Sequence, residues 1–268
     1  MSRQHLLIPC EGARMAATIE GPVEASGAAL LIVSGGHEIR SGAWGGQAWL
    51  AAQIAARGHR VLRFDRRGIG ESEGFNATYR GSGPDIASAI AFLRQHAPGR
   101  RIVAMGNCDA ASALMLASGS GADGLILCNP WTIEGEDDDA DETSRAGAQV
   151  SSLRAHYRAR LTNPAALLRL LSGKVSLRSL VGSVLAMARP RPTTRNSLVD
   201  AMSAGLNGFT GPVRFLLAEN DRTARAFRDV WPKGDARIRS CPQAGHSFVE
   251  DEARMWLVEN VAEELARL

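Results

Sequence analysis

Short apolar runs alternate with segments of helical periodicity along most of the chain. The apolar runs have the length and composition of strands that are buried on both faces of a sheet. Between two of them, Ile86, Ile90 and Leu93 repeat at the spacing of one helix face. This alternation predicts an α/β fold, with a mostly parallel eight-stranded sheet and helices on both faces. The runs are 29–33, 60–64, 101–105, 123–129 and 212–218.

The two ends of the chain complete this pattern. Residues 6–9 and 14–19 are strand-like and are separated by a gap of turn length, so we expect an antiparallel hairpin at the edge of the sheet. Near the other end, residues 237–239 predict a last strand, and an amphipathic helix is expected from about residue 249 onward.

The alternation stops between residues 131 and 207. An acidic segment comes first, followed by helical segments that carry arginines among leucines and valines. We interpret 131–207 as a helical cap inserted between two parts of one core, 1–130 and 208–268. The acidic segment is expected to be a solvated loop, because like charges crowd a short stretch of chain. The alternative is a metal site, which is less favoured because the segment lacks the glycine and the ligand spacing of a calcium loop.

The amino-acid composition limits the kinds of partner and the cellular location that we expect. The chain has 268 residues, 45% hydrophobic, which is enough for a large core. Its net charge is only +3 and its aromatic content 5%, so we expect no nucleic-acid partner. The four cysteines are widely spaced and include no C-x-x-C pair, which favours a reducing compartment without disulfides, metal or cofactor. No apolar run approaches membrane-span length, and a cytoplasmic protein is expected.

The stretch that carries the candidate chemistry follows the run 101–105. Gly106, Cys108 and Ala110 form the small–x–nucleophile–x–small pattern of a nucleophile elbow, a sharp turn between a strand and a helix. Cysteine would then be the nucleophile. The alternative is a buried cysteine at the end of a core strand, because free cysteine is among the most buried residue types.

An acid and a base are expected at the same edge of the sheet. Asp221 follows the run 212–218 and His246 follows the last strand, so both lie where ligands bind in a parallel sheet. The chain order nucleophile, acid, histidine is that of α/β hydrolases. Each residue also has an ordinary structural explanation, Asp221 as a helix N-cap and His246 as a surface residue. Glu219 and Asp229 are less suitably placed acids.

Beside the catalytic triad, the site would need an oxyanion hole. We predict that it combines the backbone amide of Asp109 with that of Gly36 or His37, in the loop after the run 29–33. Glu38 and Arg40 in this loop are candidates for substrate binding. The turn 65–72 is expected to brace neighbouring loops, since it lacks the Gly-Lys-Ser/Thr of a phosphate loop.

Two sets of motifs carry a resemblance to known families. The first set is Asp65-x-Arg67-Gly68-x-Gly70-x-Ser72, the elbow, Asp221 and Gly245-His246, and it resembles α/β hydrolases over nearly the whole chain. The second set is Gly35-Gly36 with Arg40, residues 108–113, Tyr157-Arg158-x-Arg160-Leu161, Leu170-Leu171-Ser172-Gly173 and Asp221-x-Thr223-Ala224, and it resembles the exosortase A system-associated hydrolases. This resemblance implies a cytoplasmic serine-hydrolase-like fold with a cysteine nucleophile, found among bacterial exopolysaccharide and protein-sorting genes. The pair His37-Glu38 is more charged than expected for the family.

These observations predict an enzyme that cleaves an ester or thioester through an acyl-cysteine intermediate. The same intermediate permits acyl transfer to another acceptor, and a non-catalytic scaffold that binds a small ligand is a further alternative. Arginines of the expected cap suggest a small acyl substrate carried on coenzyme A or an acyl carrier protein, unless they form a solvated helix face. A monomer or a homodimer is expected.

Overall fold

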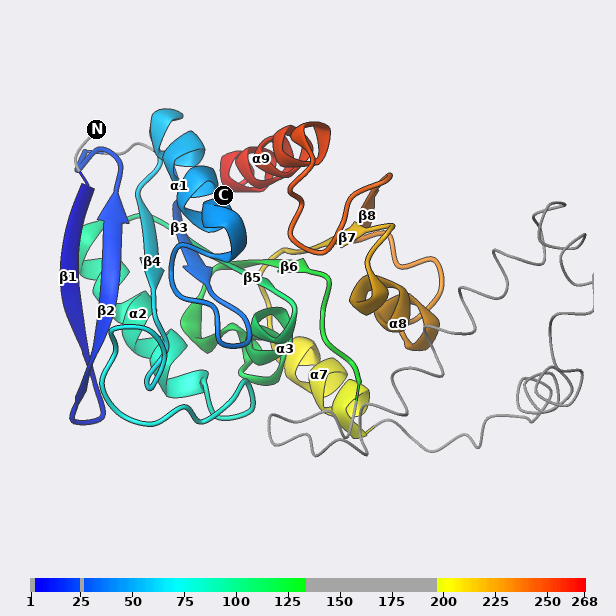
Figure 1. The fold of residues 1–268 in the computed structure, drawn as a ribbon, viewed down its shortest axis with the longest axis horizontal. Helices are drawn as coiled ribbons and strands as arrows, with labels where there is room; N and C mark the ends of the chain where they lie inside the picture. Colours follow the sequence, from blue (N-terminus) through cyan, green and yellow to red (C-terminus); the bar gives the residue numbers. More distant parts are fainter. Residues whose placement is uncertain (1–2, 25–26, 134–196) are drawn as a thin grey trace, which may run out of the picture. The chain divides into compact units, whose positions relative to one another are not determined.

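The computed structural model describes residues 3–24, 27–133 and 197–268. Within them, eight strands form one sheet in the order β1-β2-β4-β3-β5-β6-β7-β8 (Figure 1). The strands are β1 (Arg3–Cys10), β2 (Ala13–Glu20), β3 (Ala29–Val33), β4 (Val61–Phe64), β5 (Ile102–Asn107), β6 (Gly124–Cys128), β7 (Val213–Ala218) and β8 (Ile238–Cys241).

Only the first strands of the sheet run antiparallel. β1 and β2 form the expected hairpin, with Cys10 opposite Ala13 at the turn, and β2 pairs antiparallel with β4. All pairs from β4 through β8 are parallel. The predicted mostly parallel eight-stranded α/β-hydrolase sheet is therefore confirmed, and the carboxyl ends of β5, β6 and β7 meet at one edge.

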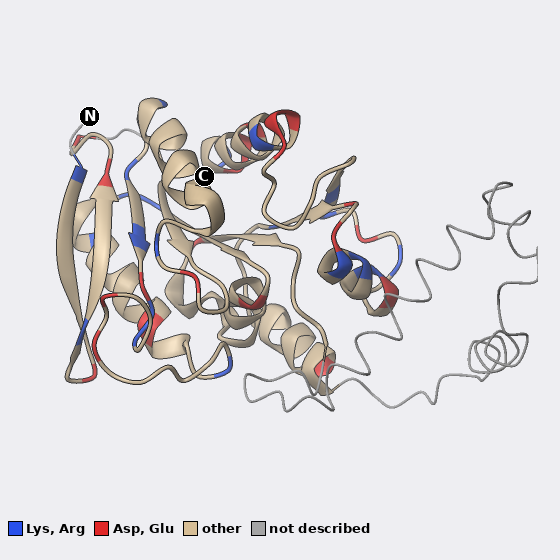
Figure 2. Ribbon diagram, in the orientation of Figure 1, with Lys and Arg blue, Asp and Glu red and all other residues tan. Residues whose placement is uncertain are grey.

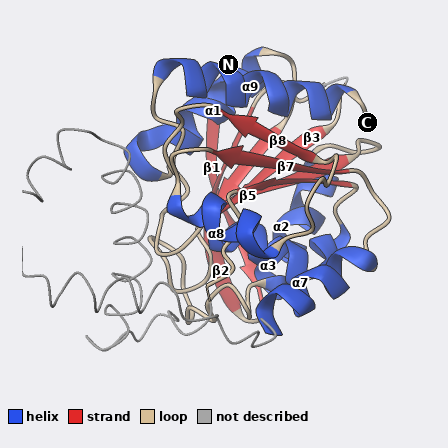
Figure 3. Ribbon diagram, turned by 90° about the vertical axis from the view of Figure 1, so that its right-hand side faces the viewer, coloured by secondary structure: helices blue, strands red, loops and turns tan. Residues whose placement is uncertain are grey.

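Helices cover both faces of this sheet. Figure 3 shows α1 and α9 on one face and α2, α3 and α7 on the other. The bounds are α1 (Gly46–Ala56), α2 (Gly83–His96), α3 (Asp109–Leu116), α7 (Ser197–Asn207), α8 (Arg222–Val230) and α9 (Asp251–Ala266), with 3-10 turns η1 (Ala43–Gly45) and η2 (Ser118–Gly121). The predicted alternation of strands and helices is thus reproduced in these ranges.

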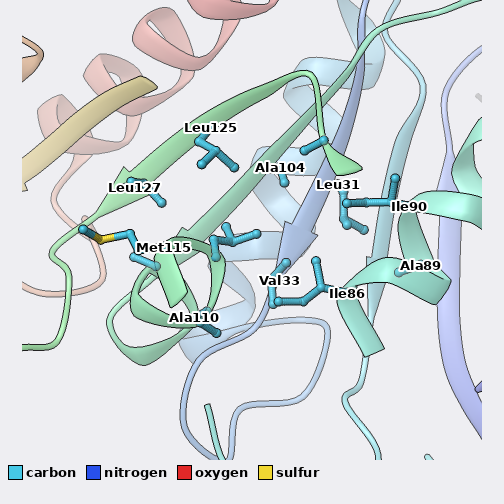
Figure 4. Close-up of a cluster of buried hydrophobic side chains, with 14 of the residues drawn as sticks. Leu31, Val33, Ile86, Ala89, Ile90, Ala104, Ala110, Met115, Leu125 and Leu127 are labelled. Carbon is cyan, nitrogen blue, oxygen red and sulfur yellow. The ribbon is translucent and has the colours of Figure 1, made fainter. Parts of the chain in front are cut away.

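Alternation within each strand divides the core between the two faces. Leu31 and Val33 point into the cluster under α2 and α3, which Figure 4 shows in detail. Leu30 and Ile32 belong instead to the cluster under α1 and α9. Because side chains alternate across a strand, a strand covered on both faces must be apolar at every position. This explains the continuous apolar runs of the sequence.

Charged side chains are absent from β3, β5 and β6, which lie in the middle of the sheet (Figure 2). They gather on outer elements such as α8 and α9. The polar groups of the candidate site therefore come from the strand ends and the loops that follow them. Among the described helices, none is long and apolar enough to cross a membrane.

The predicted boundaries of the cap differ from those of the structure. Residues 197–207, which we expected to belong to the cap, form α7, which packs against α3 in the same compact unit as the sheet. Leu198, Met202 and Leu206 of α7 are buried in the core. Residues 131–133 of the expected cap also belong to this unit. The remainder, which holds the acidic segment and the expected arginine-rich helices, is 134–196 and lies outside the described residues.

Candidate active site

Cys108 lies at the sharp turn between β5 and α3, where the elbow motif predicts it. Its backbone has φ 60° and ψ −126°, a region that side-chain-bearing residues rarely adopt. The turn also requires a glycine two residues earlier, since a Cβ on Gly106 would lie 2.6 Å from the backbone carbon of Ala110. The small residues of the motif therefore let β5 and α3 approach closely, as expected.

Backbone hydrogen bonds hold this strained turn in place. The N–H of Cys108 donates to the carbonyl of Cys128 at 3.0 Å, which ties the elbow to the end of β6. The carbonyl of Cys108 accepts from the amides of Ala111 and Trp131 at 3.1 and 3.3 Å. Neighbouring elements thus fix the backbone conformation of the elbow.

The thiol of Cys108 differs from the other three cysteines in its surroundings. Cys10, Cys128 and Cys241 are buried, and burial raises the pKa of each of these thiols. Cys108 is only partly buried. It is therefore the cysteine best placed to meet a substrate.

Asp221 and His246 come together across the ends of β7 and β8. The Nδ1 of His246 donates to Oδ1 of Asp221 at 3.0 Å. The second oxygen of Asp221 accepts from the N–H of Ala224 at 2.9 Å and so caps α8. Burial acts to raise the pKa of Asp221, but the hydrogen bonds from His246 and the helix amides outweigh it and hold this pKa below its usual range.

His246 is also within hydrogen-bond reach of Cys108. Burial acts to lower the pKa of the imidazole. Its hydrogen bonds and charge interactions with Asp221 and Cys108 outweigh burial and raise this pKa to about 10. The raised pKa favours the imidazolium form, which can stabilise a thiolate beside it. The geometry brings the three residues predicted for the catalytic triad into one hydrogen-bonded group.

Two asparagines that the sequence reasoning did not identify hold the loop of His246. Asn107 and Asn129 each donate from Nδ2 to the carbonyl of His246, at 3.2 and 3.1 Å. Asn129 also donates to Oδ1 of Asn107 at 3.0 Å and accepts from the N–H of Ala218 at 2.8 Å. Their position in the sequence could have identified them, because each is an amide side chain at the carboxyl end of a buried apolar strand.

The loop predicted to supply the second oxyanion donor is engaged with the elbow itself. The N–H of Gly36 donates to Oδ1 of Asp109 at 2.6 Å. The N–H groups of Asp109 and His37 have no hydrogen-bond partner within the described ranges, and His37 is exposed. Of the three amides predicted for the oxyanion hole, Gly36 therefore already has a partner.

Glu38 and Arg40, the candidates for substrate binding, lie in different surroundings. Burial raises the pKa of Glu38, and Gln47 donates to its carboxylate at 3.3 Å. Glu38 and Gln47 line a cavity of about 60 Å³ whose wall also includes Asn107. Arg40 instead donates to Asp65, Glu71 and Thr18, so its guanidinium is occupied by the fold.

The turn 65–72 connects several loops at this edge of the sheet. Asp65 accepts from the backbone and side chain of Arg40, and its carbonyl accepts from the hydroxyl of Ser72 at 2.7 Å. Arg66 extends from the same turn and donates to the carbonyl of Gly36 at 2.5 Å and to Oδ2 of Asp109 at 3.4 Å. This turn was expected to brace neighbouring loops, and the contact of Arg66 with the elbow is an additional feature of the structure.

Comparison with solved structures finds the same fold at low sequence identity. An alpha-beta serine hydrolase homologue from Coxiella burnetii has a TM-score of 0.61 at 15% identity, covering 99% of both chains. Est1E from Butyrivibrio proteoclasticus has 0.58 at 13%, covering 97% of this chain and 96% of its own. The Pyrococcus furiosus esterase Pf2001 has 0.60 at 14%, covering 99% and 90%.

Comparison of the sequence with known proteins identifies a family. No curated protein matches the chain. The profile of the alpha/beta hydrolase family matches residues 30–259, which begin in β3 and end in α9 and include Cys108, Asp221 and His246. With the sheet order and the elbow described above, this match shows that the chain belongs to the alpha/beta hydrolase family.

Proposed function

We propose that this protein is a cysteine-nucleophile hydrolase that cleaves an ester or thioester through an acyl-enzyme intermediate. The observation that carries the proposal is the partly exposed thiol of Cys108, in a strained elbow and within hydrogen-bond reach of the His246–Asp221 pair. A nucleophile, a base and a group that orients the base form the constellation used in covalent acyl transfer.

The first half-reaction forms a thioester on the protein. The thiolate of Cys108 attacks the acyl carbon, a sulfur–carbon bond forms, and the carbonyl electron pair moves to oxygen. When the tetrahedral intermediate collapses, the bond to the leaving group breaks and the imidazolium of His246 gives its proton to the departing oxygen or sulfur. Asp221 keeps the ring oriented and stabilises its positive charge.

The second half-reaction releases the acyl group. With the thiolate consumed, His246 is neutral and accepts a proton from water as the water oxygen attacks the thioester carbon. The sulfur–carbon bond then breaks and the thiol or thiolate of Cys108 is regenerated. An amine or alcohol in place of water gives acyl transfer by the same steps, which is the alternative outcome of this intermediate.

The substrate class follows from the nucleophile. A thiolate reacts readily with activated acyl carbons, so esters, thioesters and lactones are the substrates to test. A carrier such as coenzyme A or an acyl carrier protein would bring a negative charge that the arginines of residues 131–207 are suited to bind. The narrower resemblance to exosortase A system-associated hydrolases is part of this proposal, as is a cytoplasmic location.

Intact-mass spectrometry tests the proposal directly. The protein is mixed with a panel of p-nitrophenyl esters, acyl-coenzyme A thioesters and lactones, and the mass increase equal to the acyl group is followed with time. We expect a transient adduct with at least one substrate, no adduct in Cys108→Ala, and at least about 100-fold slower formation in His246→Ala.

The controls separate catalysis from simple thiol reactivity. Alkylation by iodoacetamide should modify Cys108 faster than the buried Cys10, Cys128 and Cys241, and this advantage should fall in His246→Ala. An inert Cys108 with no adduct across the panel would contradict the proposal and favour a ligand-binding scaffold. Adding methylamine or glycerol to the reaction shows whether the acyl group goes to water or to another acceptor.

A further inference from the structure

Asp109 lies immediately after the nucleophile and directs its side chain to the loop opposite. Its Oδ1 accepts from the N–H of Gly36 at 2.6 Å, and the Asp109 side chain is only 13% exposed. Position 35 next to it has to be glycine, because a Cβ there would lie 2.7 Å from the backbone oxygen of Asn107 and 2.8 Å from this carboxylate oxygen. The fit between carboxylate and loop is therefore specific to these residues.

Arg66 holds the same loop from its other side. Its Nη2 donates to the carbonyl of Gly36 at 2.5 Å and lies 3.4 Å from Oδ2 of Asp109, while Nη1 donates to Ser82. Arg66 is 3% exposed. The peptide groups on both sides of Gly36 are thus held, and Arg66 is a second partner onto which the Asp109 carboxylate can move without losing a buried counter-charge.

This arrangement affects the chemistry because an oxyanion needs free N–H donors. A donor that already binds a carboxylate cannot stabilise a developing negative charge, and the carboxylate itself repels that charge. In the resting protein, the amides of Asp109 and His37 are the predicted oxyanion donors that have no partner within the described ranges, and the amide of Gly36 is occupied.

We propose that Asp109 is a positioning residue that occupies the Gly36 donor of the oxyanion loop, so that Gly36 can stabilise the oxyanion only after the carboxylate has moved toward Arg66. This inference rests on the proposed function. It makes Asp109 a determinant of selectivity, because only substrates whose binding displaces the carboxylate gain Gly36 as a donor. A single oxyanion donor contributes about 100- to 1,000-fold to the rate of acyl transfer in enzymes that use two.

Two reactions of the same thiol separate this role from a merely structural one. Acylation by a p-nitrophenyl ester passes through an oxyanion, whereas alkylation by iodoacetamide is a direct displacement that forms none. Both rates are measured on wild type, Asp109→Ala and Asp109→Asn, with thermal melting as the check on folding. Asp85→Asn is the matched control, because Asp85 is also a buried carboxylate, paired with Arg67 of the 65–72 turn.

We expect the ratio of acylation to alkylation to rise about 10- to 100-fold in Asp109→Ala, because the N–H of Gly36 becomes free. Asp109→Asn should give a smaller rise, since its oxygen still accepts from Gly36 but carries no negative charge. Asp85→Asn should leave the ratio at the wild-type value. If Asp109→Ala fails to fold, the ratio measured for Asp109→Asn alone tests the inference.

An unchanged or lower ratio in the folded Asp109 variants would overturn the inference and make the carboxylate a support of the loop. That result differs from failure of the proposed function, in which the wild-type protein and all variants form no acyl adduct. An acylation rate that falls together with the alkylation rate would likewise leave the ratio unchanged, and so would also count against the inference.

Discussion

Asp221 uses its two carboxylate oxygens for different purposes. Oδ1 accepts from His246, and Oδ2 accepts from the first turn of α8. The catalytic interpretation and the N-cap interpretation of this residue are thus both consistent with its geometry. The hydrogen bond from α8 holds the carboxylate of Asp221 in place, and this carboxylate orients the imidazole of His246. The stability of α8 is therefore coupled to the geometry of the site.

Two substitutions separate these contributions. Asp221→Asn keeps an oxygen for the N–H of Ala224 but removes the charge beside His246, whereas Asp221→Ala removes both. We expect acyl-enzyme formation to fall by about 100-fold or more in each variant. Only Asp221→Ala should also lose about 0.5–2 kcal/mol in the free energy of unfolding, measured by urea denaturation. Equal losses of stability would show that the oxygen of asparagine does not replace the cap.

At the scale of elements, the site depends on how closely α3 follows β5. The elbow reverses direction within one residue, and the backbone of Ala110 lies against Gly106. α3 also packs on β6 and α7, so the helix has little freedom to retreat from the strand. The position of Cys108 is therefore determined by packing between secondary-structure elements as well as by its own backbone.

Gly106→Ala tests this close approach. The added Cβ would lie 2.6 Å from the backbone of Ala110, so the strand or helix must shift, which we expect to cost about 1–3 kcal/mol in the free energy of unfolding. The alkylation rate of Cys108 should fall as well, because the elbow moves relative to His246. Gly46→Ala is the control: it also adds a methyl group, but nothing lies within 4 Å of that Cβ, and Gly46 already has helical backbone angles as the first residue of α1. A stability loss equal to that of the control would contradict the argument.

At the scale of the whole molecule, patterning was sufficient to predict the sheet, its antiparallel edge and the strand ends that carry Cys108, Asp221 and His246. Those features follow from local rules of burial and spacing. The hydrogen bonds that Gly36 donates to Asp109 and accepts from Arg66, and those that the two asparagines donate to His246, depend on side-chain direction in loops that meet only after folding. The cap boundary also differed, because the apolar face of α7 gives no sign of which element it covers.

Protonation of His246 links the site to the stability of the whole domain. Its folded pKa is raised above the unfolded value of about 6.5, so its contribution is fully present below pH 6.5 and is lost as pH rises through the folded pKa. We compare Cys108→Ala with Cys108→Ala/His246→Ala, so that thiol ionisation does not contribute. Without the thiolate, burial still acts to lower the pKa of His246, and we expect its hydrogen bond to Asp221 to keep the folded pKa above the unfolded value.

The measurement is urea denaturation of both variants from pH 6 to pH 10. The difference in their free energies of unfolding should be largest at pH 6 and should shrink toward pH 10, because other titrating groups are common to both proteins. A difference that stays constant or grows with pH would contradict the raised pKa.

The two asparagines beneath His246 have a consequence for how the site opens. Asn129 bonds at once to the end of β7 and to the carbonyl of His246, and Asn107 belongs to the same strand end as the nucleophile. The histidine loop cannot lift away without breaking these bonds to the sheet. We therefore expect Cys108 and His246 to belong to one cooperative unit of local unfolding.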